Sequence, residues 1–510
     1  MRTTAMTLLV MLATLASAAE NARPNIIVII ADDVGYGDLS CYGATAMTTP
    51  NLDRLAAEGC RFTNGHSSAS TCTPTRYSIM TGQYAFRKKG TGIAPPNAPA
   101  LIVPGTETLP AMLQRAGYKT AAIGKWHLGL GTGAPDWNGE LKPGPLEIGF
   151  DHCLILPTTN DRVPQVFVED HHVRGLDPAD PLWVGDAAPV PNFPDGIAQR
   201  ATLRMNWTHG HNQSVHNGIG RIGFYTGGNA ARFRDEDLAD TWVAESKRWI
   251  TQHREGPFFL YFAAHNIHVP RMPHERFQGT TGLGYRGDAL AELDWCVGEL
   301  NRTLDELNIA ENTLVIFCSD NGPVLDDGYA DGAVEKLGAH RPAGPLSGGK
   351  GGVLEGGTRI PFITRWKGHI APGTSQALVA TIDLAASFPR LTGQPLTENT
   401  FPDSFDVKDA LLGAPGAAGR THLLQQDNGG TNYGLRAGDW KLIRQKHWGT
   451  SQAVITLTPH TTPKGEFALY NLAEDPGEQH DLAQTHPEKL TEMKTLLDHI
   501  FTTPRTRPAP

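Results

Sequence analysis

The sequence predicts an α/β fold with a large mixed, mostly parallel sheet covered by helices, and a smaller C-terminal α+β subdomain with an antiparallel sheet. Three observations predict it. Apolar runs of strand length alternate with helical patterns along the first two thirds of the chain. These runs are continuously apolar rather than alternating, which is typical of strands buried on both faces. After residue 393 the pattern changes to short strands separated by turns.

The predicted sheet comes from four apolar runs, at residues 25–30, 119–123, 258–262 and 313–317. Helical patterns lie between them, at residues 51–58, 109–116, 237–253 and 289–307. Strands joined through helices are expected to pair in parallel, because each helix carries the chain back across the sheet. Ligands of such sheets bind beyond the carboxyl ends of the strands, so the polar residues that follow these runs are candidates for one site.

Three regions follow from these patterns. Residues 20–393 are predicted to form the catalytic domain. Within it, residues 151–229 are rich in Pro, Gly, His and Asn without periodicity, which indicates a loop-rich insertion that faces the substrate. Residues 394–510 are predicted to form the α+β subdomain, with strands at 421–426, 433–436, 441–445 and 466–470 and a helix at 487–501.

Residues 1–19 are predicted to be a secretory signal peptide. Arg2 precedes an apolar run over residues 6–16, and the small residues Ala16 and Ala18 flank Ser17 in a cleavage pattern. The run is too short for a transmembrane anchor, and no other segment is apolar enough to span a bilayer. We therefore expect a secreted or periplasmic protein.

The net charge argues against nucleic acid as a binding partner. The chain has 44 Lys+Arg against 53 Asp+Glu and a formal net charge of −9, so it lacks the overall positive electrostatic field that would attract nucleic acid. An anionic substrate must then be held by a local cluster of cations. The six cysteines show no C-x-x-C or Cys/His spacing of a zinc site, although disulfides among some of them are compatible with an exported protein.

Two pairs of polar residues follow predicted strands. Asp32 and Asp33 come after the first run, and Asp320 and Asn321 come after the fourth. Adjacent side chains of a strand point to opposite faces, so Asp32 and Asp33 can share a ligand only from the turn beyond the strand. Oxygen ligands of this kind suit calcium or magnesium rather than zinc, but either pair alone could also be a helix cap or a turn former.

The most specific string is C-T-P-T-R at residues 72–76, which continues to T-G at residues 81–82. It resembles the signature of the type I sulfatases, members of the alkaline phosphatase-like superfamily, and the resemblance extends over nearly the whole mature chain. It implies that Cys72 is modified to formylglycine by a separate maturation system. A structural thiol without this role is the alternative reading of the same residue.

Three further strings resemble that family in the same order: residues 124–129, residues 265–270, and residues 348–352 followed by 355–359. The resemblance implies one divalent cation, Ca²⁺ or Mg²⁺, held by Asp32, Asp33, Asp320, Asn321 and the formylglycine derived from Cys72. It implies these catalytic residues: Cys72, Arg76, Lys125, His127, His268 and Lys350. In the mechanism it implies, His268 with Lys350 protonates the departing alcohol, and His127 removes a proton from the modified residue.

The substrate implied by a secreted chain with long polar loops is a sulfated polysaccharide or glycosaminoglycan sugar. The candidate sugar contacts are Thr159, Asn160, His211 and His340. Thr159 stands where some relatives have a substrate-contacting serine, which is a loose match.

Two other functions stay open at this point. Phosphodiesterases and phosphonate hydrolases share the superfamily, and most enzymes of that kind use Ser or Thr with two zinc ions; His209 and His211 could belong to a second metal set. The other alternative is a non-catalytic glycan-binding relative, which is what an unmodified Cys72 would leave.

Overall fold

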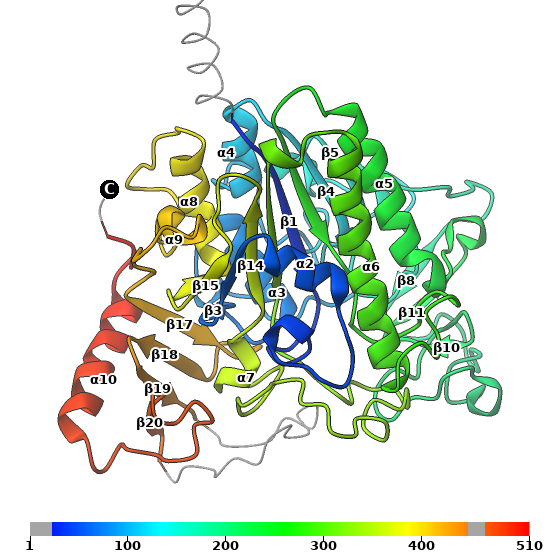
Figure 1. Cartoon of the computed structure of the whole chain (residues 1–510). Coiled ribbons are helices and arrows are strands. Elements are labelled where there is room, and N and C mark those ends of the chain that lie inside the picture. The colour runs from blue at the N-terminus through cyan, green and yellow to red at the C-terminus, as the bar shows by residue number, and fades with distance from the viewer. Residues whose placement is uncertain (1–22, 447–464, 509–510) are drawn as a thin grey trace, which may run out of the picture.

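The structure is a computed structural model that describes residues 23–446 and 465–508. The predicted signal peptide lies outside the described residues. At the centre is a ten-stranded mixed sheet in the order β15-β2-β14-β13-β1-β12-β4-β5-β6-β7 (Figure 1). Its strands are β15 (Gly373–Ser375), β2 (Cys60–Phe62), β14 (Phe362–Trp366), β13 (Thr313–Ser319), β1 (Asn25–Ala31), β12 (Phe258–Ala263), β4 (Lys119–Lys125), β5 (His152–Leu156), β6 (Val168–Glu169) and β7 (His172–Val173).

The five central strands are parallel. β1 pairs with both β13 and β12, β12 pairs with β4, and β4 pairs with β5, all in parallel, while β14 runs antiparallel to β13. The four predicted runs are therefore neighbours, and their carboxyl ends meet at one edge of the sheet. The predicted mixed, mostly parallel sheet is confirmed.

Helices cover both faces of the ten-stranded sheet, and the side chains of β1 alternate between the two hydrophobic cores that result. Ile26, Val28 and Ile30 pack into a core with α3 (Cys72–Thr81), α4 (Leu109–Arg115) and α8 (Leu384–Leu391). Ile27 and Ile29 pack on the other face with α2 (Pro50–Ala57), α5 (Leu238–Gln252) and α6 (Gly284–Glu306). All seven residues of β1 are buried, which explains its continuous apolar sequence.

The small antiparallel sheet is also confirmed. Its order is β17 (His422–Gln426), β18 (Tyr433–Ala437), β19 (Trp440–Arg444) and β20 (Phe467–Asn471). Met493, Leu497 and Ile500 of α10 (Pro487–Thr502) pack on one face of it. The other face meets Val353, next to α7 (Glu355–Thr358), and Figure 1 shows α10 and α7 on opposite sides of the sheet.

Two elements differ from the sequence expectation. The segment at 151–229, expected to be loop-rich, begins with β5, a strand of the main sheet. Its later elements are one turn of 3-10 helix (Arg200–Thr202) and short strands: β6, β7, β8 (Trp183–Gly185), β9 (Val215–His216), β10 (Ile219–Gly220) and β11 (Phe224–Thr226). The helix α3 was not expected, because all ten of its residues are buried and its sequence therefore shows no apolar stripe.

The remaining elements are short: β3 (Gly65–His66), β16 (Val379–Ala380) and α9 (Lys408–Leu411). Among the helices in the described ranges, none combines the length and the apolar character needed to cross a bilayer. All six cysteines lie in the described residues and are free thiols.

Candidate active site

The two predicted pairs of oxygen ligands lie together at the carboxyl edge of the sheet. Asp32 and Asp33 follow β1, and Asp320 and Asn321 follow the adjacent β13. Asp33 has a φ of 63°, so the chain leaves the extended conformation there, as the sequence argument required. The Asn321 side-chain amide donates to Asp33 Oδ1 at 2.7 Å. All four side chains are buried.

Arg76 holds two of these carboxylates in place. It projects from α3, is fully buried, and donates to Asp320 Oδ2 through Nε at 3.0 Å and Nη2 at 2.8 Å. The same Nη2 lies 3.3 Å from Asp32 Oδ2, and Nη1 donates to the carbonyl of Lys125 at 2.9 Å. Because these donors are already engaged, the geometry favours a positioning role for Arg76 over direct contact with a substrate.

The oxygens that remain suit a cation. Asp32 Oδ1 and Asn321 Oδ1 are buried and have no hydrogen-bond partner among the described residues. Burial and, to a lesser extent, the neighbouring Asp320 raise the pKa of Asp32 to about 7. Ligand atoms of Asp32, Asp33 and His268 lie within 4.8 Å of one another. Hard oxygens dominate this set, and they fit calcium or magnesium.

Cys72 is the first residue of α3 and faces His127. The Cys72 sulfur lies 3.2 Å from His127 Nδ1, and His127 Nε2 lies 3.0 Å from the carbonyl oxygen of Ala94. A carbonyl only accepts, so we assign the proton to Nε2, which leaves Nδ1 with a lone pair directed at residue 72. Burial and Lys125 hold the pKa of His127 well below its usual range, so the ring is neutral.

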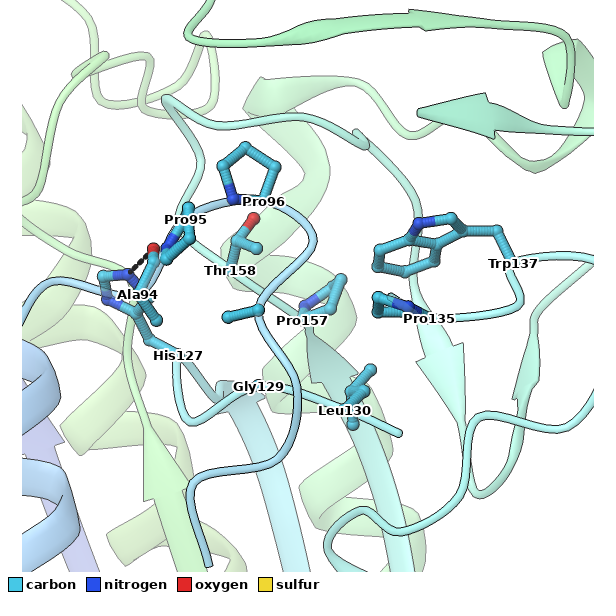
Figure 2. Close-up of a pocket in the computed structure, with 11 residues that line it drawn as sticks. Ala94, Pro95, Pro96, His127, Gly129, Leu130, Pro135, Trp137, Pro157 and Thr158 are labelled. Atoms are coloured by element: carbon cyan, nitrogen blue, oxygen red, sulfur yellow. Dashed lines mark hydrogen bonds between the residues drawn. The ribbon is translucent and has the colours of Figure 1, made fainter. Parts of the chain in front are cut away.

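Figure 2 shows His127 at the edge of a pocket whose lining side chains are mostly apolar, and the dashed line marks the hydrogen bond between His127 Nε2 and the Ala94 carbonyl. The pocket is lined by Ala94, Pro95, Pro96, Ala98, His127, Gly129, Leu130, Pro135, Trp137, Pro157 and Thr158.

The unmodified Cys72 thiol is a weak nucleophile in this setting. Its side chain is 1% exposed, and burial raises its pKa although Lys125 opposes the shift. The thiol is therefore protonated at neutral pH, and nucleophilic cysteines need the thiolate. The environment of Cys72 is consistent with a chemistry in which the residue first becomes something other than a thiol.

Two buried lysines supply positive charge. Lys125 Nζ forms an ion pair with Asp32 Oδ2. Lys350 Nζ donates to Asp33 Oδ2 at 2.8 Å and to Asp327 Oδ2 at 2.7 Å, which leaves one of its three N–H groups for another acceptor. Burial disfavours the charge of Lys350, but Asp327 and Asp33 outweigh this effect and raise its pKa well above the usual value. Lys350 is thus a permanent cation.

His268 turns one nitrogen toward the acidic cluster. Its Nδ1 donates to the carbonyl of Val269 at 2.8 Å and lies 4.0 Å from Asp161 Oδ1, so Nε2 is the nitrogen left for a ligand. Asn160 holds this loop, because its side-chain amide donates to the carbonyls of His268 and Pro270, both at 3.2 Å. Burial and Lys350 keep the pKa of His268 well below its usual range.

The other predicted sugar contacts are already paired. Thr159 bonds to Asp161 and accepts from Arg162 Nη1 at 3.2 Å. His211 places Nε2 3.0 Å from Asp161 Oδ2 and Nδ1 3.0 Å from the carbonyl of His209.

His340 is engaged elsewhere. Its Nε2 lies 2.8 Å from Asp38 Oδ1, which also accepts from Arg286 at 2.7 Å, and the side chain is buried. This pairing indicates a structural role for His340.

Two acidic residues join the site without having been singled out as ligands. Asp161 contacts His211 and Arg162 and lies near His268, which hold its pKa well below the usual range against the effect of burial. Its only signal was its place in the polar segment of Thr159 and Asn160. Asp327 pairs with Lys350 and belongs to no motif, so nothing in the sequence pointed to it.

The fold is that of the alkaline phosphatase-like superfamily. The family model described as Sulfatase matches residues 24–394. The chain therefore belongs to the sulfatase family and is a sulfuric ester hydrolase.

Several relatives resemble nearly the whole chain. An N-acetylgalactosamine-6-O-sulfatase of Bacteroides thetaiotaomicron is 45% identical over 487 residues, which cover 94% of this chain and 93% of that protein. Human arylsulfatase A is 33% identical over 509 residues, covering 95% of this chain and 89% of that protein. A solved 6S-sulfatase structure, from work on the metabolism of multiple glycosaminoglycans by Bacteroides thetaiotaomicron, has a TM-score of 0.91 at 44% identity and covers 94% of this chain and 100% of its own.

A more distant structural neighbour resembles this chain in fold only. The phosphonate monoester hydrolase of Agrobacterium radiobacter has a TM-score of 0.56 at 17% identity, covering 93% of this chain and 95% of its own.

The contacts of Asn160 generate a prediction that separates loop support from sugar binding. Asn160→Ala leaves two buried carbonyls without their donor, and an unsatisfied buried group costs about 1–3 kcal/mol. We expect a lower melting temperature and a lower kcat with little change in KM. A raised KM with unchanged stability would contradict this and make Asn160 a substrate contact. Thermal unfolding and steady-state kinetics measure the two effects.

Proposed function

We propose that this sulfatase hydrolyses a sulfate ester of a sulfated polysaccharide or glycosaminoglycan, with 6-O-sulfated N-acetylgalactosamine as its preferred sugar. The observation that carries the proposal is the contact of Cys72 with His127 beside the buried cluster of Asp32, Asp33, Asp320 and Asn321. The preference for the sugar is supported by the Bacteroides relative, which is named for that substrate.

Two groups would complete the site. Asp32, Asp33, Asp320 and Asn321 would hold calcium, or magnesium, through the oxygens described above. When bound, such a cation offsets negative charge on the sulfate and on the attacking group. Formylglycine made from Cys72 by a separate maturation system would supply, as its hydrate, two hydroxyls: one to attack sulfur and one to lose a proton.

The other residues of the site would bind the sulfate and transfer protons. Lys125 and the free N–H of Lys350 bind sulfuryl oxygens and offset their charge. His127 Nδ1, which already faces residue 72 at 3.2 Å, accepts the proton of a hydroxyl there. His268 Nε2 gives a proton to the departing sugar oxygen, and the arriving sulfate anion favours the protonated ring that this step needs. Lys350 suits this proton donation less well, because its acidic neighbours hold its proton tightly.

Export belongs to the same proposal. The apolar run after Arg2 and the small residues up to Ala18 support a signal peptide over residues 1–19. A secreted or periplasmic enzyme would meet polymeric sulfated glycans directly.

A substrate panel tests the proposal. We compare kcat/KM for three substrates. We expect kcat/KM for N-acetylgalactosamine 6-sulfate to exceed that for the 4-sulfate by at least about tenfold, and we expect kcat/KM for a phosphodiester to be much lower than both. Phosphodiester turnover above sulfatase turnover would overturn the proposal. Saturable binding of sulfated glycan without any turnover, by protein from a host that modifies Cys72, would favour the glycan-binding alternative.

A second prediction concerns His268 as the leaving-group acid. Proton donation matters most when the departing alkoxide is a poor leaving group, as a sugar hydroxyl is, and little for nitrophenolate. His268→Ala should lose about two to four orders of magnitude in kcat on a sulfated sugar. The loss on nitrophenyl sulfate should be far smaller, with unchanged metal content. Equal losses on both substrates would remove this role from His268.

A further inference from the structure

A second cluster of buried charges joins the C-terminal sheet to α7. Glu355, the first residue of α7, accepts from Arg436 Nη1 of β18 at 2.9 Å and from Lys441 Nζ of β19 at 3.0 Å. Glu478 Oε2 accepts from the Glu355 backbone N–H at 2.6 Å, and its Oε1 lies 3.1 Å from Lys441 Nζ. The side chains of Glu355, Glu478 and Lys441 are fully buried, and that of Arg436 is 4% exposed. None of these residues belongs to the proposed catalytic set.

The backbone of α7 contacts both halves of the proposed site. The Gly322 N–H, next to Asn321, donates to the carbonyl of Gly357 at 2.9 Å. A Cβ on Gly322 would lie 1.8 Å from the carbonyl oxygen of Gly356, so only glycine permits this approach. The Gly356 N–H of α7 donates to the carbonyl of Ser347 at 2.7 Å, at the start of the loop that carries Lys350 (residues 347–353, the lysine loop). The Lys350 N–H in turn donates to the carbonyl of Pro323 at 2.9 Å, which ties this loop to the turn after Asn321.

The sheet also contacts the lysine loop without charges. Val353 packs against Ile443 and Ala468 of the face of the sheet opposite α10. The Gly351 N–H donates to the carbonyl of Ser70 at 2.7 Å, and the Ser70 N–H donates to Gln426 of β17 at 2.9 Å. The strand β17 and the loop of Lys350 therefore both border the segment that leads to Cys72.

We propose that the Glu355–Lys441 ion pair positions the site, because it fixes α7 and thereby sets where Lys350 and Asn321 stand. The proposal rests on the proposed function in one respect, that Lys350 and Asn321 are working parts of the site. In this proposal the C-terminal sheet supplies two positioning residues, Lys441 and Arg436. They act through Glu355 and do not touch the substrate or the cation.

The buried carboxyl groups of this cluster depend on the neighbouring cations to stay ionised. Burial opposes ionisation of Glu355, yet Lys441 and Arg436 hold its pKa well below the usual range. Burial raises the pKa of Glu478 to about 7, although Lys441 opposes the shift. Removing Lys441 takes away the cation beside Glu478 and leaves Glu355 with Arg436 and with Arg359 at 3.5 Å. A buried carboxyl group that loses its partner is costly, so we expect the backbone beside it to shift until water can reach it. Here the backbone that would move is α7.

Replacement of Lys441 tests the proposal, with Arg87 as the matched control. Arg87 also joins the two parts of the protein: it binds Asp403 at 2.7 Å and the carbonyl of Thr503 at 2.7 Å, at the end of the chain that carries α10 rather than α7. Lys441→Met should lower kcat/KM by about 10- to 100-fold, the cost of a misplaced catalytic group. It should also speed hydrogen exchange of the amides at residues 320–322 and 347–357. Arg87→Met should lower the melting temperature without either effect, and Lys441→Arg should restore kcat/KM in part.

A double variant guards against loss of folding. Lys441→Met combined with Glu478→Gln removes the lysine together with the carboxyl group that would lose its partner, and the amide oxygen of glutamine can still accept from the Glu355 backbone. It should fold and still show the faster exchange at residues 347–357. The proposal is overturned if the Lys441 variants and Arg87→Met lose thermal stability alike while exchange at 347–357 stays as in the wild type. Because exchange needs no turnover, this result is independent of whether the wild type releases sulfate.

Discussion

The site depends on one constraint, the concentration of buried negative charge at the carboxyl edge of the sheet. Asp32, Asp33 and Asp320 are all fully buried, and such a group of carboxylates is stable only when cations surround it. Arg76 and Lys125 meet Asp32, and Lys350 meets Asp33. Two of the cations that offset this charge, Lys125 and Lys350, are the ones that the proposed function assigns to the sulfate, whereas Arg76 holds the carboxylates in position.

The parallel sheet makes this arrangement possible. Because β1 and β13 are neighbours in parallel, their carboxyl ends bring Asp32, Asp33, Asp320 and Asn321 together without any long loop. The helix α3 then enters from one face and adds Cys72 and Arg76 to the same edge. The lysine loop needs more support, since it is long and rich in glycine, and the C-terminal sheet gives that support through Glu355.

The parallel strands and the pairing of oxygen ligands could be predicted from the sequence, because continuous apolar runs and the residues after them are local signals. The helix α3 could not, since a helix buried on all sides has no periodic pattern. Nor could the partners of His340 and Lys350: Asp38 and Asp327 reach them only through the tertiary fold. The sequence predicts Asn160 as a sugar contact, whereas in the structure its side-chain amide donates to the loop of His268, a long-range contact that no local pattern encodes. Long-range pairing of polar side chains leaves no trace in local sequence.

The state of Cys72 tests the central claim most directly. Enzyme from a host with formylglycine-generating activity should give a tryptic peptide, from Phe62 to Arg76, with an aldehyde in place of the thiol. The fraction converted should rise and fall with the sulfate released per molecule, and Cys72→Ala should release none. A fully active enzyme whose peptide keeps the thiol, or full activity of Cys72→Ala, would contradict the account.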